Sequence, residues 1–168
     1  VFIFSQDQQR WCVFILTEGL AKIVSVTPVG RELIVGFANP HKLMVGLQSL
    51  SNSRYADSAV AETSITACKI RKRALLTAVT REPNVAFRLI DAMNAQLAMS
   101  RAMIRAGEQH GAAAKIAAFL LLLLPDENQS TERYEFPVSR REIANILGLS
   151  EETVCRQMAN MRRKNILY

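Results

Sequence analysis

The sequence has few cysteines, histidines and tryptophans, and it has no long hydrophobic run. Three widely spaced cysteines and two histidines are too few for a disulfide framework or for a cluster of metal ligands. The longest apolar segment, 116–124, is too short to cross a bilayer. The first residues lack the basic region and the cleavage site of a secretion signal. We therefore expect no membrane span and a location in the reducing cytoplasm.

Catalytic equipment is also scarce. The two histidines are isolated and the sequence has no glycine-rich phosphate loop, so a hydrolase or transferase is not expected. Hydrophobic residues make up 49% of the chain and charged residues 21%, which is typical of a globular protein. The net charge of +6 favours a polyanionic partner. Lys and Arg outnumber Glu from Val138 to Tyr168, so the C-terminal segment is the electropositive one.

Short apolar runs broken by turns predict a compact antiparallel β unit over roughly the first 70 residues. Turn residues such as Gly19 and Asn39-Pro40 separate the runs. The expected strands are 13–16, 20–26, 32–37 and a broken alternation over 59–70.

A heptad seam begins after Pro83, where helical periodicity takes over. Its residues alternate spacings of four and three, and they are Ala86, Ile90, Met93, Leu97, Ser100, Ile104 and Gly107. This repeat favours a helix that packs along another helix, most simply its own copy in a homodimer. The alternative is a long core helix that lies against its own β domain. His110-Gly111 ends the pattern as a hinge, and another helix is expected over 112–124.

The segment 139–158, S-R-R-E-I-A-N-I-L-G-L-S-E-E-T-V-C-R-Q-M, predicts two short helices joined by a turn. Ser139 and Glu142 have the spacing of a capping box at the start of the first helix. Gly148 suits a left-handed turn, and Ser150 is expected to cap the second helix.

The packing residues of this segment fit two helices crossed at a steep angle. Ala144 lets the helices approach, and Val154 fills the joint between them. The first helix is expected to bury Ile143, Ala144, Ile146 and Leu147. Together these features predict a helix-turn-helix; the alternative is an ordinary helical hairpin.

The second helix of this motif is expected to enter the major groove of double-stranded DNA with its N-terminal end. Its inward face carries Val154, Met158 and Met161, so the remaining residues near that end face outward. Arg can grip guanine with two hydrogen bonds, and Glu can accept one from cytosine. The expected base-reading residues are Glu151, Glu152, Cys155 and Arg156. The expected phosphate contacts are Ser139, Arg140, Arg141, Ser150, Thr153, Arg162, Arg163 and Lys164, for which the alternative is an ordinary solvated charged surface.

With a β unit, a long helix and a hinge ahead of it, the run F-P-V-S-R-R-E-I-A-N-I-L-G-L-S-E-E-T-V-C-R resembles the CRP/FNR transcription regulators, over nearly the whole chain. The resemblance implies an α+β fold. An N-terminal antiparallel β-roll, a cyclic-nucleotide-binding-like jelly roll, would span 1–82 and a long dimerisation helix 83–110. A winged helix-turn-helix domain would span 111–168, with the wing cut off, and the chain is expected to be an excerpt of a longer protein.

In that family a Glu and an Arg four residues apart read a TGA-containing half-site, and Glu152 and Arg156 match them. Two neighbouring residues differ from the family pattern. The CRP branch has Arg where this chain has Glu151, and the FNR branch has Ser where it has Cys155. The resemblance implies a homodimeric activator without enzymatic activity. It would bind a palindrome containing TTGA and TCAA, with RNA polymerase as a further partner.

The family's cyclic-nucleotide members hold the phosphate with Gly-Glu and Arg-Ser-Ala segments. Here the corresponding stretches read Val45-Gly46-Leu47 and Tyr55-Ala56-Asp57. Leu47 replaces the carboxylate that holds the ribose, and Asp57 would repel a phosphate. We therefore expect no cAMP binding, with Arg54 as the only residue that offers a phosphate contact.

Metal-based sensing is the next alternative that the resemblance raises. FNR holds a [4Fe-4S] cluster with three N-terminal cysteines and one later cysteine, near which Cys68 lies. Cys12 and Cys68 cannot supply the ligands alone, so a cluster requires cysteines in an N-terminal extension. Haem would need His41 or His110 as an axial ligand, and both are expected to be solvated. An iron-sulfur or haem gas sensor in a longer protein, and a ligand-binding module that does not act on DNA, stay open as alternatives.

Cys155 is the redox candidate. It is expected on the groove-facing side of its helix beside Arg156, whose positive charge favours the reactive thiolate. Oxidation would add bulk and charge where the helix meets the bases, and would weaken DNA binding. The alternative is a cysteine that only fills the place of the family's serine.

Overall fold

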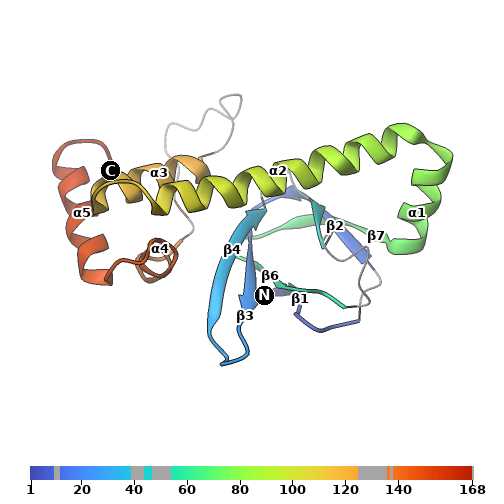
Figure 1. The fold of residues 1–168 in the computed structure, drawn as a ribbon, viewed down its shortest axis with the longest axis horizontal. Helices are drawn as coiled ribbons and strands as arrows, with labels where there is room; N and C mark the ends of the chain where they lie inside the picture. The colour runs from blue at the N-terminus through green and yellow to red at the C-terminus, as the bar shows by residue number, and fades with distance from the viewer. Residues whose placement is uncertain (10–11, 39–43, 47–53, 125–135, 137, 168) are drawn as a thin grey trace. The chain divides into compact units, whose positions relative to one another are not determined.

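The computed structural model describes residues 1–9, 12–38, 44–46, 54–124, 136 and 138–167. It divides into two compact units, Val1–Ser100 and Arg101–Tyr168. Figure 1 shows the order of the elements along the chain. None of the helices in the described ranges is long and apolar enough to cross a membrane.

The first unit contains two antiparallel sheets, which confirms the α+β class and the N-terminal β fold. One sheet has the strand order β1-β6-β3-β4 and the other β5-β2-β7. The tight turn between β3 and β4 closes with the Gly30 amide donating to the Thr27 carbonyl at 2.8 Å, and Gly30 has φ 78°. The strands are β1 (Phe2–Phe4), β2 (Cys12–Glu18), β3 (Ala21–Val26), β4 (Glu32–Ala38), β5 (Met44–Val45), β6 (Ser58–Ala61) and β7 (Thr66–Arg71).

Three of the expected strands correspond to β2, β3 and β4, and the broken run over 59–70 corresponds to β6 and β7. The sequence did not indicate β1 or β5, because they are only three and two residues long. Segments this short show no alternation that distinguishes them from loops. Asn39-Pro40 lies outside the described residues.

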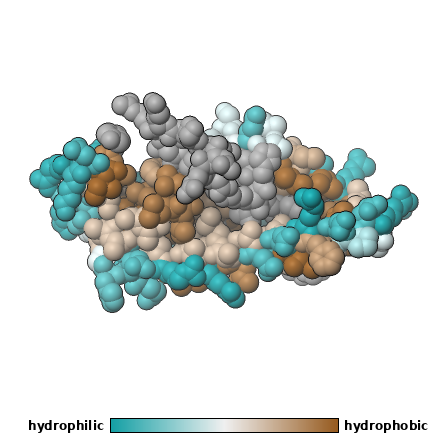
Figure 2. Space-filling model, turned by 90° about the horizontal axis from the view of Figure 1, so that it is seen from above, coloured by the Kyte–Doolittle hydropathy of each residue, from teal (hydrophilic) through white to brown (hydrophobic). Residues whose placement is uncertain are grey.

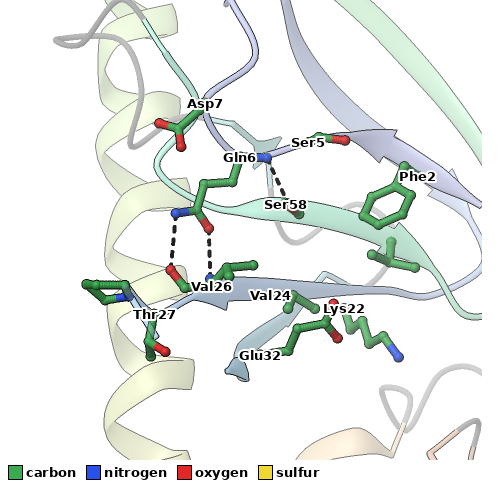
Figure 3. A pocket seen from close by; sticks show the side chains of 12 residues that line it. Phe2, Ser5, Gln6, Asp7, Lys22, Val24, Val26, Thr27, Glu32 and Ser58 are labelled. Carbon is green, nitrogen blue, oxygen red and sulfur yellow. Dashed lines mark hydrogen bonds between the residues drawn. The ribbon is translucent and has the colours of Figure 1, made fainter. Parts of the chain in front are cut away.

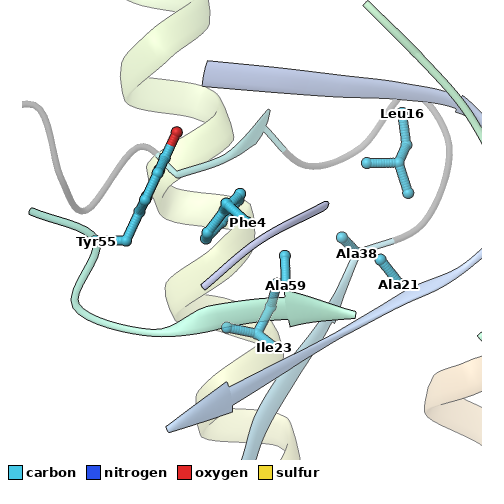
Figure 4. Close-up of a cluster of buried hydrophobic side chains, with 7 residues drawn as sticks. All are labelled: Phe4, Leu16, Ala21, Ile23, Ala38, Tyr55 and Ala59. Atoms are coloured by element: carbon cyan, nitrogen blue, oxygen red, sulfur yellow. The ribbon is translucent and has the colours of Figure 1, made fainter. Parts of the chain in front are cut away.

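Aromatic and small side chains fill the interior between the strands (Figure 4). Phe4 stacks on Tyr55 with ring centroids 3.9 Å apart, and on Phe14 at 5.8 Å. The Tyr55 hydroxyl donates to the backbone carbonyl of Cys12 at 2.6 Å, so its polar end is satisfied although the residue is buried. The other buried members of this cluster are Leu16, Ala21, Ile23, Ala38 and Ala59.

Two helices follow the strands. α1 (Lys72–Arg81) was not expected from the sequence, because no capping side chain and no acidic residue in the first turn mark its start directly after a strand. α2 (Pro83–Gly107) begins at Pro83, where a residue without an amide hydrogen costs a helix nothing. Val85, Leu89 and Ala92 of α2 pack against Val13 and Leu75.

The second unit is helical and is built around α3 (Ala112–Leu123), as expected after the hinge. Gly111 precedes α3 with φ 86° and ψ 147°, a backbone conformation that residues other than glycine rarely adopt. α4 (Arg140–Leu147) and α5 (Glu151–Arg163) complete the unit, and both pack on α3. The buried residues of α3 are Ile116, Phe119, Leu120 and Leu123.

Candidate functional site

The start of α4 has the capping box that the sequence predicted. The Ser139 hydroxyl accepts from the Glu142 amide at 3.2 Å, and the Glu142 carboxylate accepts from the Ser139 amide at 2.8 Å. The hydroxyl of Ser139 also donates to that carboxylate at 2.7 Å. These bonds satisfy amides that the first turn of a helix leaves free.

The turn between α4 and α5 is equally well defined. Gly148 takes the left-handed conformation with φ 63° and ψ 36°, and the Leu149 amide donates to the Ala144 carbonyl at 2.9 Å. Ser150 then caps α5, accepting from the Thr153 amide at 3.1 Å. The local sequence therefore fixes both the end of α4 and the start of α5.

The joint between the two helices is closed. Val154 is fully buried, as expected for the residue that fills the joint. Ala144 is 4% exposed, as expected for the small residue at which the helices approach each other. Ile143, Leu147 and Met161 are buried too, whereas Ile146 and Met158 are only partly buried. The expected inward faces are thus confirmed for most residues, and these two lie at their edges.

The outward face of α5 carries a carboxylate and a guanidinium one helical turn apart. Glu152 and Arg156 form an ion pair of 3.7 Å, and their side chains are 86% and 60% exposed. Glu151 is also exposed, while Cys155 is partly exposed. A surface pair of this kind contributes little to stability, so both groups can exchange their partner at small cost.

Arg140 makes a contact that sequence reasoning missed. Its guanidinium, at the first residue of α4, donates to the Cys155 sulfur on α5 at 3.6 Å. The contact joins residues fifteen positions apart, and it depends on the crossing of two helices. No spacing rule within one helix could have indicated it.

The other expected phosphate contacts have different surroundings. Arg141, Arg162, Arg163 and Lys164 are exposed, and Arg163 donates to the Asn160 side chain. The hydroxyls of Ser139 and Ser150 serve as helix caps. Thr153 is partly buried, and its hydroxyl accepts from that of Ser150 at 2.8 Å.

The heptad seam on α2 lies largely in the open. Ile90, Met93 and Leu97 are each about half exposed, and Ile104 is 68% exposed. Ala86, Ser100 and Gly107 are partly buried. Figure 2, which looks down from above α2, shows brown and tan side chains forming a band with hydrophilic ones along one border.

The stretch that corresponds to the phosphate-binding segment of cyclic-nucleotide proteins carries a half-buried carboxyl. Burial raises the pKa of Asp57, and a hydrogen bond with Ser25 acts in the opposite direction. The Arg54 guanidinium donates to the Asp7 carbonyl at 3.0 Å. Leu47 lies outside the described residues. The described part of this stretch thus carries a carboxyl, which opposes phosphate binding, and the absence of cAMP binding stays a prediction.

The candidate metal ligands that the structure describes do not converge. Cys12 is buried opposite Arg71, whereas Cys68 is exposed opposite Ile15 on the same strand pair. In the described ranges, no group of three or more His, Cys, Asp or Glu could hold a metal ion. His110 is exposed, and His41 lies outside the described residues.

A hollow of about 660 Å³ lies on the face of β3 opposite Ala21 and Ile23 (Figure 3). The Gln6 side chain crosses it, accepting from the Val26 amide at 2.8 Å and donating to the Val26 carbonyl at 3.3 Å. The backbone amide of Gln6 donates to the Ser58 hydroxyl at 2.9 Å. These bonds tie the turn that follows β1 to β3 and β6, which gives the residues of this hollow a structural role.

Two families match the chain. Residues 1–82 match the cyclic nucleotide-binding domain, and residues 114–168 match the Crp-like helix-turn-helix domain. Together they cover the β unit, α1, most of α3, α4 and α5, and they leave out α2.

Curated relatives match nearly the whole chain. The transcriptional activatory protein AadR of Rhodopseudomonas palustris is 29% identical over 168 residues, 98% of this chain and 69% of that protein. The transcriptional activator protein anr of Pseudomonas aeruginosa is 29% identical over 169 residues, 99% of this chain and 69% of that protein. The structure of FixK2 from Bradyrhizobium japonicum has the same fold, with a TM-score of 0.82 and 23% identity over 99% of this chain and 82% of that one.

Proposed function

The chain belongs to the CRP/FNR family of transcription regulators, which are not enzymes, and we propose that it is a homodimeric activator acting in the cytoplasm. Each protomer reads one half of a TTGA/TCAA-like palindrome in double-stranded DNA. The observation that carries this proposal is the exposed Glu152–Arg156 pair on the first turns of α5.

Base reading follows from the chemistry of this pair. In the free protein, the carboxylate and the guanidinium neutralise each other at 3.7 Å. Inside a major groove, Arg156 donates two hydrogen bonds to the O6 and N7 atoms of guanine. Glu152 accepts from the N4 amino group of cytosine. Glu151 and Cys155 occupy flanking positions on the same helix end and contact the neighbouring bases.

Phosphate contacts orient the helix over the groove. Arg140 and Arg141 stand at the start of α4, and Arg162, Arg163 and Lys164 at the end of α5, all exposed. The hydroxyls and amides at the N-termini of both helices add donors, which include Ser139, Ser150 and Thr153. These contacts supply affinity without sequence information.

A homodimer forms along the heptad seam of α2. This helix has two apolar stripes: Val85, Leu89 and Ala92 face its own β unit, while the seam centred on Leu97 is uncovered. The stripes lie roughly 90° apart around the helix at 3.6 residues per turn. One face of α2 therefore packs on its own β unit, and another face is left for a partner helix. Pairing the seams buries apolar side chains and sets the two recognition helices about 34 Å apart.

RNA polymerase is the second expected partner of this protein, since an activator recruits or contacts it.

DNA binding by itself is tested by fluorescence anisotropy. Across a salt series, a duplex with the palindrome is expected to keep an advantage over a scrambled duplex of equal length. Equal affinities at every salt concentration would leave only nonspecific attraction between a basic protein and DNA.

The redox state of Cys155 controls DNA binding in this proposal. The Arg140 guanidinium donates a hydrogen bond to the Cys155 sulfur at 3.6 Å and so holds it at the outward face of α5. Attack of the thiolate on hydrogen peroxide breaks the O–O bond and gives a sulfenate and water, and the added oxygen lies where α5 meets the bases.

Peroxide is expected to weaken binding of the palindrome by about tenfold, reversibly with a thiol reductant, and Cys155→Ser is expected to be resistant. Mass spectrometry of Cys155 is expected to show slower oxidation in Arg140→Gln than in Arg141→Gln, a neighbour that serves as the matched control. Unchanged DNA affinity in the oxidised protein would reject this control mechanism.

A further inference from the structure

A second basic cluster lies far along the sequence from the helix-turn-helix, at the corner where β7 runs directly into α1 (Figure 1). Lys69 and Arg71 belong to β7, and Lys72 and Arg73 open α1. All four side chains line a hollow of about 900 Å³. The hollow is completed by Cys12, Leu76 and Thr77.

The positive charge of this corner is not neutralised within the first unit. Among the residues that the structure describes, no carboxylate forms an ion pair with any of the four cations. No acidic residue lies in the first turn of α1, and no side chain caps its amides. The partial positive charge of the helix end therefore adds to the side-chain charges rather than opposing them.

Two of the lining residues, Cys12 and Leu76, are apolar. Leu76 is 47% exposed, although it is a large aliphatic side chain. Cys12 is 8% exposed, and its thiol has no hydrogen-bond partner within the described ranges. A lining that combines four cations with apolar side chains suits a ligand that carries anionic groups and an apolar body.

Two physical considerations favour a small ligand over a macromolecule. The volume lies within the usual range of small-molecule sites, roughly 300–1,000 Å³. The lining comes from the single stretch 69–77 and from Cys12, which pairs with Arg71 across β2 and β7. Cations on the edge strand β7 also discourage edge-to-edge pairing of sheets, but that role does not account for Lys72 and Arg73, which belong to the helix.

We propose that the β7–α1 corner binds a small molecule with two or more phosphate groups and an apolar ring, the chemistry of a nucleoside polyphosphate. Arg71 and Arg73 bind the phosphates together with Lys69, Lys72 and the first amides of α1. The ring lies on Leu76. Binding at this corner does not depend on the base-reading role of α5.

Isothermal titration of the full chain with ATP and with inorganic tripolyphosphate tests the site. Both are expected to bind once per chain, and Arg71→Gln/Arg73→Gln is expected to weaken each by at least about tenfold. The matched control is Arg162→Gln/Arg163→Gln, which removes the same charge from α5 and is expected to change the affinity less than about twofold. Cyclic AMP, with one phosphodiester, is not expected to bind there.

Two further measurements separate this site from the DNA-binding surface. Arg71→Gln/Arg73→Gln is expected to bind the palindromic duplex as the wild type does, since its exposed side chains lie outside the helix-turn-helix. Leu76→Ser is expected to remove the preference for ATP over tripolyphosphate. No saturable binding of either probe at millimolar concentration, or equal weakening by both double variants, would overturn the proposal. ATP that binds no tighter than tripolyphosphate would overturn the ring contact with Leu76.

Discussion

Arg156→Ala is expected to lower the affinity for a TTGA/TCAA palindrome by at least about thirtyfold while the protein stays folded and dimeric. A bidentate Arg–guanine contact contributes about 1–3 kcal/mol of discrimination, and a dimer makes two of them. The Arg156 side chain is exposed and pairs only with the exposed Glu152 in the described structure, so truncation costs little stability. Fluorescence anisotropy gives the affinity, and light scattering checks the dimer.

Arg163→Ala is the control for this variant. It removes an exposed guanidinium from the other end of α5. Loss of a phosphate contact should weaken all duplexes alike, and it should reduce the slope of log affinity against log salt by about 1 per contact. If both variants weakened specific and scrambled duplexes equally, Arg156 would be a phosphate contact rather than a base reader.

Leu97→Arg is expected to dissociate the dimer and, with it, to abolish tight binding of the palindrome. Leu97 lies in the middle of the uncovered seam and is about half exposed in the single chain. In a parallel pair, the two copies of this residue face each other. Two guanidinium groups would then be buried side by side, at a cost of several kcal/mol. Light scattering at micromolar concentration should give the mass of one chain.

Ala98→Arg is the matched control, because Ala98 is the next residue of α2 and is exposed outside the seam. It introduces the same side chain, and it should leave both the dimer and DNA binding unchanged. A Leu97→Arg protein that remains dimeric would move the interface away from this seam.

The helix-turn-helix was predictable because its signals are local. A capping serine, a glutamate three residues later and a left-handed glycine act within a few residues of one another, and each adopts the expected geometry. The outward face of α5 followed from helical spacing once Val154 was assigned to the joint. Exposure of Glu152 and Arg156 is therefore confirmed, while their contacts with bases remain a prediction.

Features that depend on tertiary structure were not predictable in this way. The Arg140–Cys155 contact requires the crossing of α4 and α5. The start of α1 follows β7 without a capping side chain or an acidic first turn, so no local signal marks it. The four cations of the basic hollow are neighbours in the sequence, but the hollow itself forms because β7 continues directly into that unforeseen helix and Cys12 is brought beside it by strand pairing.

The contacts inside the β unit could not be predicted from the pattern of strands either. Tyr55 stacks on Phe4 and bonds to the Cys12 carbonyl, which lies 43 positions away. The sequence identified Tyr55 only as part of a stretch lacking a phosphate-binding arginine. Its ring instead contributes to the core, a role that depends on strands distant in sequence.

The most direct test of base reading compares wild type and Arg156→Ala on four palindromic duplexes that differ only at the guanine of TTGA. The wild type should prefer guanine at this position by about 1–3 kcal/mol per half-site. Arg156→Ala should bind all four duplexes with similar, weak affinity, because the group that distinguishes the bases is gone. If the variant kept the wild-type preference for guanine, another residue would read that base and the assignment to Arg156 would be wrong.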